Sequence, residues 1–330
     1  MKPRLAITLG DVNGIGPEIT LKALAHPTMG EICSPVVVGS VQALESARAF
    51  APNCPPLKAV QSMKDRFPTD AVPVLGSGAP PPQLNPGVVT AEAGCAAVEW
   101  IKEAVRLALR KEVDGIVTCP VNKKGIQLAG YPYLGHTEIL QEMTGVDEVF
   151  MSLFSDKLRI VHVTAHRPLK DAIAALDTPR IVRAVRAGYD ALVRLGLRQK
   201  RIAVAGVNPH AGEDSILGTE EDRIVKPAVE ACRAEGLPCS GPYPPDTVFR
   251  RMFEGEFELV VALYHDQGHV PFKLVAMDEG TQVTLGIPIV RTSVDHGTAY
   301  DIAWKGVARE NSLCAAVRFA ALLARSQAQP

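Results

Sequence analysis

The sequence predicts an α/β protein with mostly parallel sheets. Short apolar runs alternate with helical stretches along the chain. This alternation is typical of strand–helix units that build parallel sheets. The length of 330 residues exceeds what one simple core can bury, so two lobes of ordinary domain size are expected.

Each element is predicted from its own pattern. Strands are short apolar runs, and helices are stretches whose apolar residues recur at helical spacing, most clearly at 90–109. The first helix has a proline in its first turn, where no backbone donor is lost. In chain order, the predicted elements are strand 5–9, helix 17–24, an apolar run at 36–38, a helical stretch from residue 41, helix 90–109, strand 115–118, strand 159–163, helix 178–195, strand 202–207, helix 220–235, strand 259–263 and helix 311–325.

Composition excludes several classes of function. Hydrophobic residues make up 47% and charged residues 22% of the chain, so a packed core is expected rather than disorder. The net charge of −1 and the lack of a long basic stretch argue against a nucleic-acid partner. The sequence has no window of roughly 20 uninterrupted apolar residues, so a membrane partner is not expected.

The cysteines and the N-terminus predict a cytoplasmic protein. The seven cysteines are odd in number and form no C-x-x-C pair, which argues against a disulfide framework or a thiolate zinc site. The apolar run at 5–9 is too short for the core of a signal peptide.

Three histidines follow three predicted strands. His166, His210 and His265 each lie within three residues of a strand end, and such ends can meet at one edge of a sheet. Three neutral imidazoles bind a divalent metal and leave positions open for a substrate. Such a nitrogen site suits zinc, with cobalt or magnesium as alternatives. Asp246 and Asp266 could orient a ligating imidazole, or they could simply cap a turn or helix. The alternative for the histidines is three unrelated loop positions.

A glycine-containing loop near the N-terminus joins a strand to a helix. Its sequence at 10–18 is G-D-V-N-G-I-G-P-E, which allows a ligand to approach the backbone at a helix N-terminus. It matches neither G-x-G-x-x-G nor a P-loop. A purely structural turn, in which Asp11 makes local hydrogen bonds, therefore remains an alternative.

Other polar positions could bind an anion or a cofactor. His136 and Thr137 open a predicted helix, where free N–H groups could accept a phosphate and Thr137 could be the cap. Lys273 and Arg291 adjoin apolar stretches, so each could hold an anion, although isolated basic residues usually face solvent. The polar loop at 293–301, before an expected helical segment, could hold an adenosine group.

The motifs along the chain together resemble one family. Taken as a set they are similar to the PdxA family, the 4-hydroxythreonine-4-phosphate dehydrogenases of pyridoxal phosphate synthesis. The motifs are G-D-V-N-G-I-G-P-E, C-P-V-N-K, G-H-T-E, T-A-H-R-P-L, N-P-H-A-G-E, Y-H-D-Q-G and R-T-S-V-D-H-G-T-A.

The resemblance implies a fold and a reaction. The fold is that of isocitrate and isopropylmalate dehydrogenases, with two α/β/α lobes and a cleft between them. One lobe would comprise 1–125 and 270–330, and the other 126–269 with the metal histidines and much of a dimer interface. The reaction would be NAD- or NADP-dependent oxidation of 4-phosphohydroxy-L-threonine at its C3 hydroxyl, followed by decarboxylation to 3-amino-2-oxopropyl phosphate.

The resemblance also implies residue roles. The metal would be bound by the three histidines already named, drawn from both subunits of a homodimer that shares its active sites. The general base does not follow from the sequence: Asp246, Asp266 and His136 are candidates, and Lys273 is a further catalytic candidate. Substrate contacts fall on His136, Thr137, Lys273, Gln282 and Arg291, and cofactor contacts fall on His296, Gly297, Thr298 and Ala299.

Departures from the family pattern keep alternatives open. Gln282 stands where the family usually has asparagine, and Trp304 stands where it has glycine. His269, in H-D-Q-G-H, is similar to relatives that oxidise phosphorylated threonate or erythronate. The alternative substrates are therefore 4-phospho-D-threonate and 4-phospho-D-erythronate. More distant alternatives are a phosphoacyl transferase, which needs no metal, and a non-catalytic binding protein, which needs no hydride acceptor.

Overall fold

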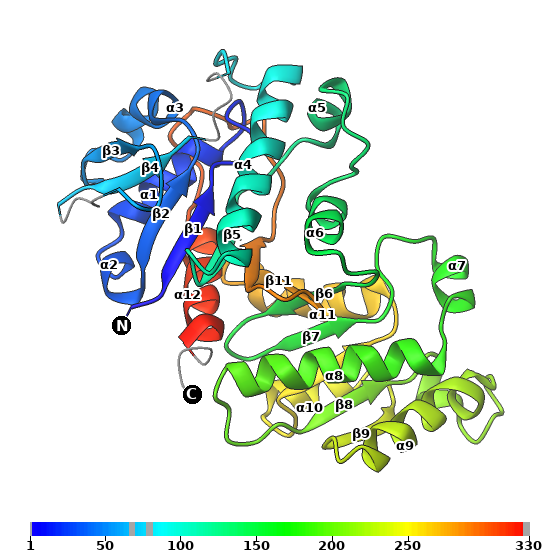
Figure 1. Ribbon diagram of the computed structural model, residues 1–330. Helices are drawn as coiled ribbons and strands as arrows, with labels where there is room; N and C mark the ends of the chain where they lie inside the picture. The colour runs from blue at the N-terminus through cyan, green and yellow to red at the C-terminus, as the bar shows by residue number, and fades with distance from the viewer. Residues whose placement is uncertain (1, 66–69, 77–81, 326–330) are drawn as a thin grey trace. The chain divides into compact units, whose positions relative to one another are not determined.

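The chain divides into two compact units. The computed structural model describes residues 2–65, 70–76 and 82–325. Unit 1 comprises Met1–Val149 and Ile287–Arg325, and unit 2 comprises Phe150–Gly286. Each contains six strands with helices on both faces of them (Figure 1), which confirms the predicted α/β class. No helix in the described ranges is long and apolar enough to span a membrane.

Unit 1 contains six parallel strands in the order β3-β4-β2-β1-β5-β12. The central strands are fully buried on both faces, as parallel sheets covered by helices require. Their bounds are β1 Arg4–Thr8, β2 Ser34–Val38, β3 Leu57–Val60, β4 Val72–Leu75, β5 Gly115–Thr118 and β12 Arg291–Val294.

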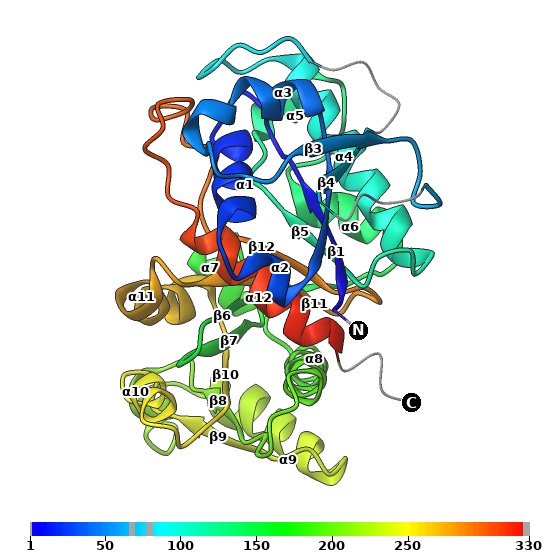
Figure 2. The ribbon, with the colours of Figure 1, turned by 90° about the vertical axis from the view of Figure 1, so that its left-hand side faces the viewer.

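The helices of unit 1 form two layers. In Figure 2 the strands β1 and β4 lie between α1 on one side and α4 on the other. The longest helix, α4, begins where the Thr90 side chain accepts a hydrogen bond from the N–H of Ala93 (3.2 Å), an N-cap. The helices are α1 Gly16–Ala25, α2 Met29–Ile32, α3 Val41–Ser46, α4 Ala91–Leu109, α5 Lys123–Leu128, α6 His136–Thr144 and α12 Asn311–Arg325, with a 3₁₀ turn η1 at Arg48–Phe50.

Unit 2 contains a mixed sheet in the order β11-β6-β7-β10-β8-β9. The strands from β7 to β9 are parallel, whereas β6 runs antiparallel to both β7 and β11. The strands are β6 Phe150–Phe154, β7 Arg159–His162, β8 Ile202–Ala205, β9 Cys239–Tyr243, β10 Leu259–Ala262 and β11 Thr281–Leu285.

Helices cover both faces of the unit 2 sheet. Figure 1 shows α8 and α9 on one face and α10 and α11 on the other. A core that includes Phe249, Phe257 and Phe272 lies between the second pair and the sheet. The helices are α7 Leu169–Ala174, α8 Thr178–Arg194, α9 Lys226–Ala234, α10 Val248–Phe253 and α11 His265–Ala276, with short turns η2 Pro209–Gly212 and η3 Glu221–Val225, the latter a π-helix.

The boundaries between the units differ from the expected ones at 125/126 and 269/270. Helices α5 and α6 pack against α4, so the chain up to residue 149 belongs to unit 1. Strand β11 pairs with β6, so the chain up to residue 286 belongs to unit 2. As a result, His136 and Thr137 lie in unit 1, whereas Lys273 and Gln282 lie in unit 2.

One local expectation was wrong. No helix follows the loop at 293–301, because β12 ends at Val294 and the next helix, α12, begins only at Asn311. Ala299 and Trp304 have positive φ angles of 45° and 60°, which a right-handed helix excludes. The predicted helix 220–235 is confirmed, as a π-helical turn η3 that continues directly into α9.

Candidate active site

In unit 1 the glycine loop and the candidate cofactor loop lie against each other. The N–H of Ile15 donates to the carbonyl of Thr298 (3.1 Å). A Cβ on Gly14 would lie 2.7 Å from that same carbonyl oxygen, so only glycine permits this approach. Two motifs nearly 300 residues apart in sequence therefore contact each other through their backbones.

Side chains fix the path of the cofactor loop. The hydroxyl of Tyr300 donates to Asp11 Oδ2 (2.6 Å), and the indole N–H of Trp304 donates to the carbonyl of Val12 (2.9 Å). Burial raises the pKa of Asp11, although hydrogen bonds from Tyr300 and from the backbone oppose the shift. Asp11 also accepts from the N–H of Asn13 (2.9 Å), as its predicted local role requires. His296 is exposed, and its ring nitrogen lies 3.0 Å from the carbonyl of Gly297.

A buried basic site lies at the start of α6. Arg291, only 2% exposed, donates to the hydroxyl of Thr118 (2.7 Å), and burial lowers its pKa to about 9. His136 is the first residue of α6, and its Nε2 is buried with no hydrogen-bond partner among the described residues. Burial, and then the charge of Arg291, lowers the pKa of His136 to about 3. An anion bound here would offset the charge of Arg291 and use the free N–H groups of the helix start.

Thr137 does not cap this helix. The N-cap residue is Gly135, whose φ of 165° is extended, and Thr137 is the second residue inside α6. No side-chain hydrogen bond caps the helix, so its first N–H groups are not used by a local side chain.

We expect His136 to make the protein less stable in mild acid. The unfolded chain takes up a proton near pH 6.5, whereas folded His136, with its pKa of about 3, does not. Above pH 6.5 the His136 side chain therefore has no effect on the free energy of unfolding. Below pH 6.5 it lowers the free energy of unfolding, by at most about 1.4 kcal/mol per pH unit. Urea unfolding at about pH 7 and about pH 5.5 measures this slope, which should be shallower in His136→Asn. An equal slope in His136→Asn and in the exposed control His26→Asn would contradict the assignment.

In unit 2 two of the predicted metal ligands meet at the edge of the sheet. His166 follows β7 and His265 begins α11, directly after β10, the neighbouring parallel strand. Their ring centroids lie 5.5 Å apart, and both line a cavity of about 240 Å³ together with Tyr264 and Asp266. Asp266 Oδ1 lies 2.6 Å from Nδ1 of His265, a contact that would leave Nε2 of this ring for a ligand.

His210 lies on a loop with an unusual backbone. The loop follows β8, which is parallel to β10, so all three histidines come from adjacent strands. The run from His210 to Ser215 has positive φ throughout, a conformation that costs most residues about 1–2 kcal/mol each. The buried carboxylate of Glu221 accepts from the N–H groups of Val207 and Asn208, both at 2.7 Å, and so holds the base of this loop.

The three histidines do not form one group within a single chain. In the described ranges no three His, Cys, Asp or Glu side chains come close enough together to hold a metal ion. The structure therefore brings His166 and His265 together but not His210, and the triad stays a prediction.

The remaining candidates are spread over α10, α11 and β11. Asp246 is exposed and lines a cavity of about 750 Å³ with Asp266 and with apolar residues of α10 and α11. Lys273 is half-buried on α11, two turns after His265, and Gln282 is on β11 opposite Leu153.

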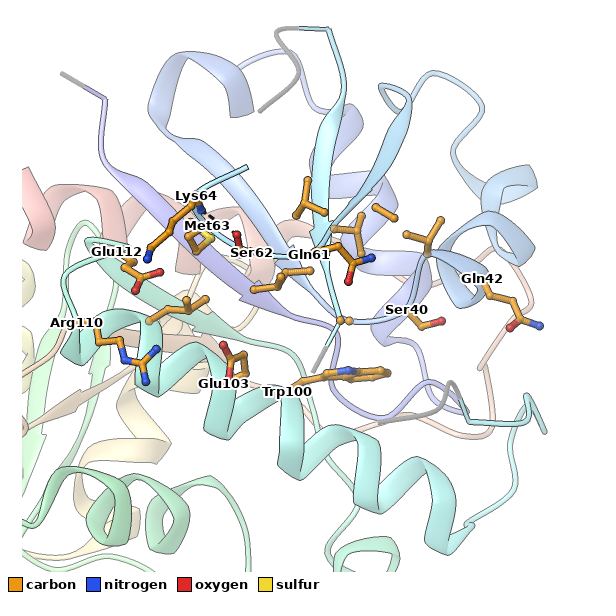
Figure 3. A pocket seen from close by; sticks show the side chains of 18 residues that line it. Ser40, Gln42, Gln61, Ser62, Met63, Lys64, Trp100, Glu103, Arg110 and Glu112 are labelled. Atoms are coloured by element: carbon orange, nitrogen blue, oxygen red, sulfur yellow. Dashed lines mark hydrogen bonds between the residues drawn. The ribbon is translucent and has the colours of Figure 1, made fainter. Parts of the chain in front are cut away.

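A second cavity of about 750 Å³ lies in unit 1, at the carboxyl ends of β2, β3 and β4 and beside α4 (Figure 3). Its polar lining mixes charges of both signs, with Lys64 and Arg110 near Glu103 and Glu112. None of the predicted site residues lines it.

Two histidines next to the candidate metal ligands were not assigned a role from sequence. His162, the last residue of β7, is buried and contacts His269 of α11. Burial, and then the neighbouring His269, lowers the pKa of His162 to about 3. The signal for His269 is its spacing from His265 in H-D-Q-G-H, which places both on one face of a helix.

Comparison with known proteins places the chain in a family. The profile described as "Pyridoxal phosphate biosynthetic protein PdxA" matches residues 31–320. The chain belongs to the PdxA family. Its motifs had already indicated this family, and that prediction is confirmed.

Relatives of this PdxA-family chain carry two names. It is 44% identical to a D-threonate 4-phosphate dehydrogenase of Cupriavidus necator, over 99% of this chain and 98% of the relative. It is 42% identical to a 4-hydroxythreonine-4-phosphate dehydrogenase of Desulfosudis oleivorans, over 97% and 95%. The crystal structure of a 4-hydroxythreonine-4-phosphate dehydrogenase from Klebsiella pneumoniae matches with a TM-score of 0.88 and 42% identity, over 98% of each chain. The PdxA-family chain is accordingly an oxidoreductase that acts on a CH–OH group.

Proposed function

We propose that this chain oxidises 4-phosphohydroxy-L-threonine at its C3 hydroxyl, with loss of carbon dioxide to give 3-amino-2-oxopropyl phosphate. The observation that carries the proposal is the buried basic site of Arg291 and His136 at the start of α6. A dehydrogenase of a phosphorylated acid needs such a site to hold an anionic group away from the reacting carbon. The dehydrogenase names of the relatives do not support a transferase or a binding protein.

The roles of the residues follow from their chemistry. Arg291, His136 and the first N–H groups of α6, all in unit 1, hold one anionic group of the substrate and so help to fix its orientation. Lys273 of unit 2 remains a further candidate for an anion contact. Asp266 holds the His265 ring so that Nε2 faces a ligand. Asp246, Asp266 and Lys273 remain the candidates for proton transfer from the hydroxyl.

A divalent metal fits the histidine pair in unit 2. His166 and His265 supply two imidazoles from one chain. The partner subunit would complete the site with its own His210 as the third ligand. Ligands drawn from two subunits explain why one chain does not gather all three. We propose zinc, with cobalt or magnesium as alternatives. When bound, the metal supplies Lewis-acid stabilisation to the oxygen that loses its proton and to the charge left by decarboxylation.

The relatives' dehydrogenase activity indicates a nicotinamide cofactor, which takes up the hydride. We propose NAD or NADP bound along His296, Gly297, Thr298 and Ala299. The support is the contact of this loop with the glycine loop, which leaves backbone groups of two loops side by side.

A homodimer is supported by an apolar surface on unit 2. Val270, Leu274 and Val275 of α11 and Phe253 of α10 are exposed, and all line the cavity that contains Asp246. Leu274 is 86% exposed, and exposed apolar groups gathered in one patch mark interaction sites.

A cytoplasmic location and the lack of a nucleic-acid partner remain predictions from the sequence.

We expect Leu274→Asp to shift the protein from dimer to monomer, because a carboxylate in an apolar interface loses its hydration. Light scattering coupled to size exclusion measures the mass. Val307→Asp, at an exposed apolar position of unit 1, is the matched control. An unchanged dimer in Leu274→Asp would assign the interface to another surface.

The second candidate substrate is 4-phospho-D-threonate, favoured by relatives of 43–44% identity that carry this name. This compound has a hydroxyl where the amino acid has an ammonium group. Gln282 and His269, which depart from the usual pattern, keep this candidate and 4-phospho-D-erythronate open.

The decisive experiment follows NADH formation with all three compounds, before and after chelation and with added zinc, cobalt or magnesium. Turnover of 4-phosphohydroxy-L-threonine that chelation abolishes and metal restores would support the main proposal. Turnover of the threonate or erythronate alone would keep the mechanism and change the substrate. Turnover of none would overturn the proposed function.

A further inference from the structure

A chain of contacting histidines runs from the interior of unit 2 to the candidate metal ligand. His162 ends β7 and is 1% exposed, and its Nε2 lies 3.1 Å from Nδ1 of His269. The His269 ring lies flat on the ring of His265, with centroids 3.6 Å apart and planes inclined by 12°. The buried strand is therefore linked to His265 through one intervening ring.

The hydrogen bonds define which nitrogen carries each proton. Nδ1 of His162 lies 3.2 Å from the carbonyl oxygen of Met151, which can only accept, so this nitrogen carries the hydrogen. Nε2 of neutral His162 then accepts from Nδ1 of His269. That same Nδ1 lies 3.1 Å from the carbonyl oxygen of His265, a second acceptor. His269 is thus held in one tautomer and one ring orientation by two acceptors.

The backbone is built to allow this contact. A Cβ on Gly268 would lie 2.4 Å from Nε2 of His162, closer than any side chain permits. Glycine at this position lets α11 approach β7 closely enough for the two imidazoles to meet. The contact joins residues 107 positions apart in sequence.

We propose that His162 and His269 are positioning residues for the metal centre. His162 anchors His269, and the His269 ring fixes the plane of the His265 imidazole, whose Nδ1 contacts Asp266. Residues that orient a metal ligand typically change metal affinity about 10- to 100-fold when they are replaced. This inference rests on the proposed metal function.

The test is metal binding by the full-length protein, freed of metal and titrated with Co²⁺ and with Zn²⁺. We expect His269→Leu and His162→Leu each to raise the Kd about tenfold or more and to alter the visible absorption of bound Co²⁺. The double variant should lose little more than either single one, because both act through one contact. His269→Phe keeps a flat ring over His265 but cannot donate to His162, so its Kd should match that of His162→Leu. His26→Leu, an exposed histidine of unit 1, is the matched control.

The outcomes separate this inference from the proposed function. A wild-type protein that binds neither ion overturns the metal site and the inference with it. A wild-type protein that binds, with unchanged Kd and Co²⁺ spectrum in His269→Leu and His162→Leu, leaves the metal function standing and overturns the positioning role. Thermal unfolding of each metal-free variant shows whether a lost affinity reflects misfolding. If His162→Leu misfolds, His269→Leu and His269→Phe decide the question.

Discussion

Replacing His210 by alanine should remove the metal and lower kcat/KM by roughly three orders of magnitude. Lewis-acid stabilisation by a bound metal is worth several kcal/mol, and every 1.4 kcal/mol or so is a factor of about ten in rate. His210 lies on a loop held by Glu221 through backbone hydrogen bonds, not through its own ring, so the metal-free fold should persist. Metal content by mass spectrometry and steady-state kinetics measure the two effects.

The matched control is His26→Ala, which removes an exposed histidine far along the chain from every candidate ligand. Mixed dimers formed from His210→Ala and His166→Ala chains test the shared site. If each site takes its ligands from two subunits, some sites in the mixed dimers combine the intact His166 of one subunit with the intact His210 of the other. Activity should return at those sites. Full activity and metal content in His210→Ala would show that the three-histidine site is wrong.

Replacing Arg291 by methionine should weaken substrate binding about 10- to 100-fold while leaving the free protein equally or more stable. A hydrogen bond to a charged group contributes about 1.5–3 kcal/mol, which corresponds to this range of KM. The charge of Arg291 is held at a cost in the free protein, because burial lowers its pKa to about 9. Methionine has a similar length and no charge to desolvate.

Steady-state kinetics with the phosphorylated substrate and urea unfolding of the free protein measure the two halves of this prediction. Compared with Arg291→Met, Arg291→Lys keeps a positive charge but lacks the planar guanidinium group with its paired N–H donors. It should therefore recover part of the substrate affinity. A KM that is unchanged in Arg291→Met would remove Arg291 from the anion site. A large loss of stability would instead show that its contact with Thr118 is structural.

The sequence predicted the elements whose patterns are local. The buried strands β5 and β10 are continuous runs of apolar, mostly β-branched residues, and the helix α4 has both a cap and an apolar face. Strands β11 and β12, with sequences T-Q-V-T-L and R-T-S-V, escaped prediction because their polar residues obscure the pattern. They become strands because they pair with β6 and β5.

By itself the sequence determined the α/β class, the family and the identity of the candidate ligands, because these reside in local patterns and motifs. Only the tertiary structure decided which groups meet. It placed the cofactor loop against the glycine loop, Arg291 beside His136, and His162 beneath His269. It also moved the unit boundaries, through the pairing of β11 with β6. Contacts between residues more than 100 positions apart depend on strand order and on close backbone approach, which no local pattern specifies.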